Sequence, residues 1–282
     1  MTVARRAAAE LLGTAFLVMA VIGSGIAASR LSPGNIGLQL LENSFATGAA
    51  LVALILALQP VSAAFNPVVT LVERAFGLVD TSTAAALVAA QMLGGCLGAV
   101  VANLMFGLDP VSLATTERGG GGVLLAEVVA TFGLLLIIFG TLRSGRTEGV
   151  AFAVGAYISA AYFFTSSTSF ANPAVTVARM LSDTFAGIAP SSVLPFVAMQ
   201  ALGGALAAGA VLALYPTVRR ARASASPPFS SCASTTPDGR RWRPASCSTW
   251  PETGSTCSRP ARSRPTPSTR RRWRPWPRSA ST

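Results

Sequence analysis

The stretch TSSTSFANPAVTVARM, Thr165 to Met180, decides the fold of this 282-residue chain. It places an Asn-Pro pair, ordinarily a turn signal, in a region with no charged side chain from residue 149 to residue 178. A second pair stands in SAAFNPVVTLVER, Ser62 to Arg74. Proline is well tolerated in the first turn of a helix, and asparagine before it is a strong N-cap. The two stretches therefore predict short helices over about residues 66–76 and 172–182.

The composition is that of a membrane protein. The chain is 51% hydrophobic and only 12% charged, which is too apolar for a soluble globular domain. A bilayer core of about 30 Å is crossed by about 20 apolar residues of helix, and the runs without charged side chains allow six such helices. We expect them over residues 8–29, 39–60, 83–107, 120–142, 149–168 and 191–215.

The chain repeats one design. Glu10 and Glu127 each open a half, an Asn-Pro pair follows, and Gln91 and Gln200 each precede a Gly-Gly pair. Three spanning helices per half is an odd number, so the second half enters the membrane from the opposite side and the halves are inverted repeats. We place these repeats at about residues 5–108 and 117–218 of a channel domain, residues 1–222.

The two short helices have a physical explanation if they face one another across a pore. Irregular backbone at membrane depth is stable only where it is buried in protein or lines a water-filled cavity. The predicted fold is therefore an all-α membrane protein with six transmembrane helices and two re-entrant half-helices. The alternative is that both Asn-Pro pairs form ordinary turns outside the membrane.

These features resemble the aquaporin, or major intrinsic protein, family across about residues 5–218. The resemblance implies a homotetramer in membrane lipid, with one pore per subunit and small neutral solutes as its partners. It also implies that the box asparagines donate hydrogen bonds to the passing solute. The two boxes are Asn66, Pro67 and Val68, and Asn172, Pro173 and Ala174. The intramembrane acids Glu10 and Glu127 either hold the re-entrant loops or contact the solute directly.

The predicted constriction departs from the family pattern. Water and glycerol channels that resemble this chain carry arginine directly after the second box, where this sequence has Val175. Arg179 lies one helical turn farther and is not a simple replacement. Small neutral linings predict a wide filter with a weak electrostatic barrier, so strict water selectivity is not expected. The resemblance implies that the ring consists of Thr47, either Ala160 or Ala161, either Ser169 or Phe170, and Val175.

The C-terminal segment, residues 223–282, has a different composition. It holds 11 of the 22 basic residues but only two acidic ones, and it is rich in proline and serine. Such a composition predicts a disordered basic tail. Read one base out of frame, Phe229 to Arg243 can spell VLFVCVHNAGRSQMA, which resembles arsenate reductases of the low-molecular-weight tyrosine phosphatase type. We interpret the tail as a frame-shifted remnant. The alternative is a genuine tail that binds anionic lipid or nucleic acid.

The sequence as a whole predicts a passive channel for small uncharged solutes, not an enzyme. A reductase of this type produces arsenite, which near neutral pH is mostly an uncharged trihydroxide, so the out-of-frame text favours arsenite exit. Glycerol, boric acid or water is the alternative solute. The alternative of another class is a structural membrane protein with a closed pore and a basic tail that binds lipid or nucleic acid. Histidine is absent, and we expect no metal, no cofactor and no nucleic acid partner.

The arginines give the expected orientation. They are more numerous on the side of the membrane that holds both termini, and the positive-inside rule places that side in the cytoplasm. We therefore expect a multi-pass protein of the cell inner (plasma) membrane with both termini cytoplasmic.

Overall fold

A computed structural model describes residues 1–215 of the chain, and the predicted tail at residues 223–282 lies outside the described residues. Six of the helices in this part are long and apolar enough to cross a membrane, which confirms the predicted all-α membrane fold. The long helices are α1 (Val3–Leu31), α2 (Ile36–Leu58), α4 (Thr81–Met105), α5 (Gly121–Arg143), α6 (Val150–Phe164) and α8 (Pro190–Leu214). A short 3-10 helix, η1 (Thr147–Gly149), leads into α6.

Polar side chains cap the long helices of the first half. Thr2, Asn35 and Asp80 each accept a backbone N–H of the first turn of α1, α2 and α4. Asp80 also accepts the hydroxyls of Ser82 and Thr83, both at 2.6 Å. These hydrogen bonds, led by that of Ser82, hold the pKa of the Asp80 carboxyl well below its ordinary value. Its negative charge therefore stays at the positive end of the α4 dipole.

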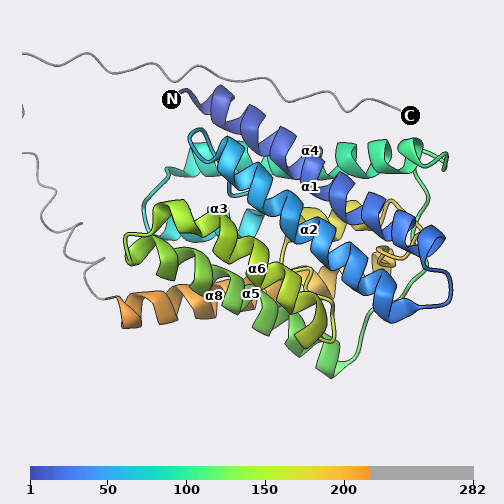
Figure 1. Ribbon diagram of the computed structural model, residues 1–282. Coiled ribbons are helices and arrows are strands. Elements are labelled where there is room, and N and C mark those ends of the chain that lie inside the picture. Colours follow the sequence, from blue (N-terminus) through green and yellow to red (C-terminus); the bar gives the residue numbers. More distant parts are fainter. Residues whose placement is uncertain (216–282) are drawn as a thin grey trace, which may run out of the picture. The chain divides into compact units, whose positions relative to one another are not determined.

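The long helices form two matching groups. In the first half α1 packs against α2 and α4, and in the second half α5 packs against α6 and α8. Contacts between α2 and α6 join the two groups. Figure 1 shows that α1 begins and α8 ends at the same end of the bundle, which we call the terminal end. The other end is called the opposite end below.

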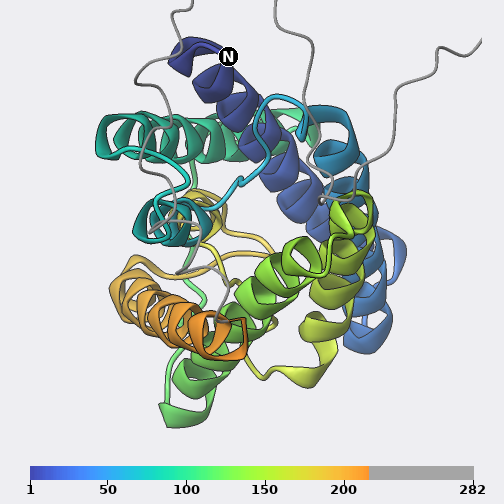
Figure 2. The ribbon, with the colours of Figure 1, turned by 90° about the vertical axis from the view of Figure 1, so that its left-hand side faces the viewer.

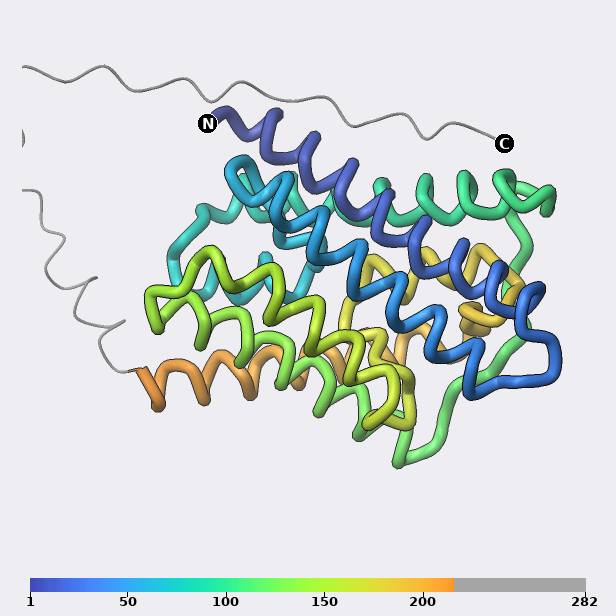
Figure 3. Tube along the Cα trace, viewed as in Figure 1, coloured from blue at the N-terminus to red at the C-terminus, as the bar shows by residue number. Residues whose placement is uncertain are grey.

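The two Asn-Pro stretches form short helices inside the bundle, α3 (Pro67–Ala75) and α7 (Pro173–Arg179). At 1.5 Å per residue, each is at most about 14 Å long and cannot cross a bilayer core of about 30 Å. Figure 2 shows α3 between α4 and α8, and α7 contacts the same two helices. The short helices run in opposite directions from the middle of the bundle (Figure 3). The fold thus brings their N-terminal ends together.

Close backbone contacts hold each half together. A methyl group on Gly94 or Gly98 of α4 would lie 2.3 Å from the carbonyl oxygen of Leu11 or Ala15 on α1. In the second half, a methyl group on Gly203 of α8 would lie 2.5 Å from the carbonyl oxygen of Val128 on α5. Small residues allow such approaches in lipid, where dispersion contacts between helices supply much of the attraction.

We expect Gly98→Ala to lower the free energy of unfolding by about 1–3 kcal/mol, because the added methyl group pushes α4 away from α1. Gly209→Ala is the matched control, since no atom lies within 4 Å of its added methyl group. Thermal unfolding of the two purified variants in detergent measures the difference. Equal midpoints for both variants would contradict the close contact.

Candidate functional site

The two Asn-Pro boxes meet at the middle of the bundle. Asn66 caps α3 by accepting the N–H of Val68 at 2.9 Å, and Asn172 caps α7 by accepting the N–H of Ala174 at 3.0 Å. Their amide nitrogens then cross over. Asn66 Nδ2 donates to the carbonyl of Ala171 at 2.8 Å, and Asn172 Nδ2 donates to the carbonyl of Phe65 at 2.7 Å. Each amide has a second hydrogen, which is available to a solute.

The residue before each box has an unusual backbone. Phe65 has a φ of 47° and Ala171 a φ of 49°, in the left-handed region that costs an L-residue about 1–2 kcal/mol. This conformation turns the Phe65 and Ala171 carbonyls toward the opposite asparagine, where they accept the crossed hydrogen bonds. The strained residues therefore join the two half-helices.

A buried carboxylate holds each strained loop. Glu10 accepts the backbone N–H of Ala64 at 2.9 Å and of Phe65 at 2.7 Å, as well as the Ser62 hydroxyl at 2.5 Å. Gln91 donates to the same carboxylate at 2.8 Å. With all four donors directed at it, the Glu10 carboxylate replaces its lost hydration by hydrogen bonds.

The second half repeats this arrangement. Glu127 accepts the backbone N–H groups of Phe170 and Ala171, both at 3.0 Å, and the Gln200 amide at 2.6 Å. Both Glu10 and Glu127 have no exposed surface, and neither lines the central cavity. The geometry thus gives these acids a role in positioning the loops, without solute contact.

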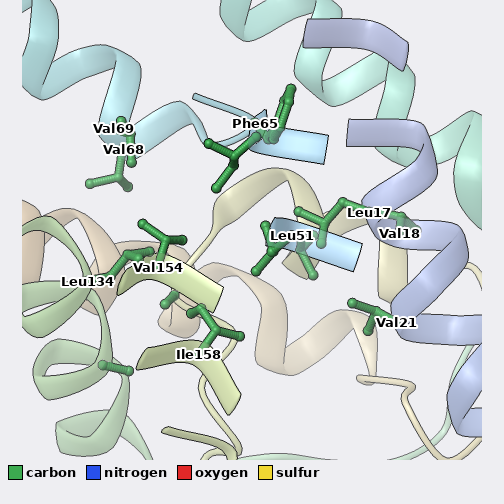
Figure 4. Packing of buried hydrophobic residues seen from close by; sticks show 14 of the residues in the cluster. Leu17, Val18, Val21, Leu51, Phe65, Val68, Val69, Leu134, Val154 and Ile158 are labelled. Carbon is green, nitrogen blue, oxygen red and sulfur yellow. The ribbon is translucent and has the colours of Figure 1, made fainter. Parts of the chain in front are cut away.

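A cavity of about 300 Å³ lies inside the bundle, beside the crossed amides. Its terminal end is lined by Arg6, Gln59 and Glu73, and its middle by the two box asparagines. Apolar side chains make most of the remaining wall. Figure 4 shows several of them, gathered from α1, α2, α5 and α6: Leu17, Val21, Leu51, Leu134, Val154 and Ile158. The arrangement offers a solute hydrogen bonds along one side and an apolar surface elsewhere.

Other members of the boxes support the half-helices from outside the cavity. Pro67, Val68, Pro173 and Ala174 are buried but do not line it. Val68 packs directly against Gly204 of α8. A methyl group added to this glycine would lie 2.3 Å from the Val68 side chain. A methyl group on Gly95 of α4 would lie 3.0 Å from the backbone carbonyl oxygen of Ala174. The absent side chain of Gly204 therefore makes room for the Val at the place where the family usually has Ala.

Toward the opposite end, several predicted ring residues share the cavity. Thr47, Ser169, Phe170 and Val175 all line it, so both loop candidates are present. Ala160 is instead exposed, and Ala161 is buried away from the cavity. The structure places Tyr162 there, and its hydroxyl donates to Thr47 Oγ1 at 3.2 Å.

The reason for this difference is the register of α6. The helix ends at Phe164, four residues before the predicted end at residue 168. Val150, Val154 and Ile158 line the cavity at intervals of four residues. Residues four apart lie on one face of a helix, so the next lining position is Tyr162. This periodicity was the signal in the sequence that could have identified it.

Arg179 also lines the cavity, although it was not predicted as a ring residue. It follows Val175 by four residues, so the two share one face of α7. Its side chain is only 2% exposed, its Nε donates to the carbonyl of Ala186, and its guanidinium lies 3.5 Å from the centre of the Phe170 ring. A positive charge therefore stands beside this part of the cavity.

A second arginine approaches the same ring from the loop before α5. The Arg118 guanidinium lies 5.1 Å from the Phe170 ring centre and donates to the carbonyl of Gly187 at 2.9 Å. Burial lowers the pKa of Arg118 from its ordinary value. Among residues 1–215, no group of three His, Cys, Asp or Glu side chains could hold a metal ion.

Comparisons with known proteins agree with this architecture. A sequence profile described as Major intrinsic protein matches residues 1–166. The chain is 47% identical over 204 residues to Aquaglyceroporin AqpS of Rhizobium meliloti (strain 1021), across 72% of this chain and 87% of that protein. It is 29% identical over 241 residues to Probable aquaporin AqpM of Archaeoglobus fulgidus, across 74% of this chain and 95% of that protein.

A solved structure shares the fold. The X-ray structure of the aquaglyceroporin from Plasmodium falciparum superposes with a TM-score of 0.60 at 18% sequence identity. The superposition covers 78% of this chain and 100% of that one.

We expect Glu10→Gln and Glu127→Gln each to lower the free energy of unfolding by at least about 3 kcal/mol, because an amide NH₂ replaces an oxygen that now accepts hydrogen bonds. Glu148→Gln is the control, since Glu148 is exposed in η1. Thermal unfolding in detergent and the yield of folded protein from membranes are the measurements. Unfolding midpoints equal to that of Glu148→Gln would show that the carboxylates do not hold the loops.

Proposed function

The chain belongs to the major intrinsic protein family of membrane channels for small solutes, and from this premise we propose that it lets arsenite leave the cell by passive diffusion. The observation that carries the proposal is the cavity wall, where a short apolar side chain, Val175, stands at the position of the family arginine. This side chain leaves room for solutes larger than water. Membership of a channel family also supports the prediction that the chain is not an enzyme.

The chemistry of arsenite suits such a path. Near neutral pH it is an uncharged trihydroxide with about the size and hydroxyl pattern of glycerol. The second amide hydrogens of Asn66 and Asn172 can donate to its oxygens, while the hydroxyls of Thr47 and Ser169 lie farther along the same cavity.

One observation favours arsenite, and another favours its main competitor, glycerol. The out-of-frame text at residues 229–243 resembles an arsenate reductase, and a channel encoded beside such an enzyme would release its product. Residues 229–243 lie outside the described residues. Their out-of-frame translation supports arsenite as the solute only through the neighbouring enzyme that it indicates. Glycerol is the second candidate, because the relative from Rhizobium meliloti is named an aquaglyceroporin. Boric acid and water are further neutral solutes that fit the same path.

The proposed setting follows from the arginines and the family. Arg5, Arg6, Arg74, Arg143 and Arg146 belong to segments at the terminal end, whereas Arg30 and Arg118 belong to the opposite end. The positive-inside rule then places the terminal end in the cytoplasm of a cell inner membrane. We also propose a homotetramer in lipid, with one pore in each subunit.

We expect cells that contain a separate arsenate reductase and are loaded with arsenate to release arsenite faster when they also produce this chain. Arsenite in the medium is measured over time, and cells without the channel are the control. Equal release would contradict arsenite exit. Swelling of vesicles that contain the purified chain is then measured in glycerol. The vesicles swell if the chain is a glycerol channel, and they do not swell if its pore is closed.

We expect Val175→Arg to reduce glycerol flux by about tenfold or more, because a guanidinium narrows the ring and binds to its hydroxyls. Water flux should fall less, since water is smaller. Val175→Leu is the control for size without charge and should reduce glycerol flux less. Vesicle swelling measures both fluxes. Unchanged glycerol flux in Val175→Arg would show that residue 175 does not lie at the narrowest point.

A further inference from the structure

We infer that Arg179 is a specificity-determining residue of the constriction, and that it supplies from one turn farther along α7 the positive charge that Val175 lacks. The inference rests on the proposed function as a channel for neutral solutes. It assigns to Arg179 two tasks: to donate hydrogen bonds to solute oxygens, and to exclude cations of the same shape.

The position of the guanidinium is fixed on two sides. Its Nε donates to the carbonyl of Ala186, and its Cζ lies over the Phe170 ring, 3.5 Å from the ring centre. Phe170 is itself held, because its backbone N–H donates to Glu127 at 3.0 Å and its ring packs against Phe196. The long side chain is therefore oriented by contacts before any solute arrives.

The guanidinium still has hydrogen bonds to offer. It carries five N–H donors, and within residues 1–215 the Nε–H bond to Ala186 is the single hydrogen bond that its side chain makes to the protein. The residue is 2% exposed and lines the cavity. The remaining donors can meet a hydroxyl or carbonyl oxygen of a solute in the cavity.

Arg179 has no ion-pair partner, because no carboxylate of residues 1–215 lies within ion-pair distance of its guanidinium. The Glu127 carboxylate, which accepts three hydrogen bonds, acts on this charge from a longer distance and offsets it only in part. Arg118, on the same phenylalanine, adds a second positive charge. The other charged residues that line the cavity, Arg6 and Glu73, lie at the terminal end. Two guanidinium groups therefore face the Phe170 ring beside this part of the cavity, and their positive charge disfavours cations in a low-dielectric passage.

Urea and guanidinium form a suitable pair of probes, because both are planar with four heavy atoms and only guanidinium is charged. The full chain is placed in vesicles, and uptake of each radiolabelled solute is measured. Their permeability ratio is independent of the number of channels per vesicle. We expect the wild type to admit urea and exclude guanidinium, and Arg179→Gln to lower the urea-to-guanidinium ratio by about tenfold or more.

Three further variants separate charge from structure. Arg179→Lys keeps the charge and should keep most of the ratio. Arg30→Gln is the matched control, since Arg30 also stacks on a phenylalanine and donates to a carbonyl, that of Phe106, but does not line the cavity. Its ratio should equal that of the wild type. Ser169→Asp leaves Arg179 in place but adds a negative charge to the ring, and it should lower the ratio.

The outcomes are distinct. The inference is overturned if Arg179→Gln keeps the wild-type urea-to-guanidinium permeability ratio. It is also overturned if Arg179→Lys lowers this ratio as far as Arg179→Gln does. If Arg179→Gln does not fold, Ser169→Asp decides, and an unchanged ratio there overturns it. Equal permeation of urea and guanidinium through the wild type would also overturn it. Absence of urea, glycerol and arsenite flux in the wild type would instead refute the proposed channel function.

Discussion

The hydrogen bonds to two buried carboxylates are the interactions on which the rest of the structure depends. A re-entrant loop brings backbone N–H groups into an apolar interior, where an unpaired one costs several kcal/mol. Glu10 and Glu127 accept these groups on Ala64, Phe65, Phe170 and Ala171. Because the loops are held in this way, Phe65 and Ala171 can keep their left-handed conformations, and each carbonyl reaches the asparagine of the other half. The crossed amides follow from the carboxylates.

Much of this arrangement could be predicted because its signals are local. An asparagine before a proline caps a helix whatever surrounds it, so the starts of α3 and α7 at Pro67 and Pro173 could be read directly. The order of the glutamate, the Asn-Pro box and the Gly-Gly pair occurs twice, so the two halves could be matched to each other. The six long helices are confirmed because their apolar runs match the bilayer in length. These features depend on residue type and spacing alone.

The constriction was harder to predict because it depends on three-dimensional register. The segment from Thr165 to Asn172 includes three residues with positive φ, at Thr168, Ser169 and Ala171. No propensity predicts such a path, so the point where α6 ends was misplaced and Tyr162 was missed in favour of Ala160 or Ala161. Arg179 was set aside because it follows the expected position by four residues. Its long side chain and the Phe170 ring that orients it become visible only in the fold.

The proposed roles of Val175 and Arg179 separate two tasks that one arginine directly after the box would combine. Val175 lines the cavity, so we propose that its volume sets the width of the passage. A residue one turn farther is displaced by about 5.4 Å along the helix axis, and Arg179 reaches the cavity from there with its stem and ring contacts buried. Val175 can then keep the passage wide while Arg179 keeps it positive. Width suits a bulky trihydroxide, and the charge still distinguishes it from a cation of similar size. A channel for neutral solutes needs both a wide passage and a positive charge. Val175 and Arg179 supply them from successive turns on one face of α7.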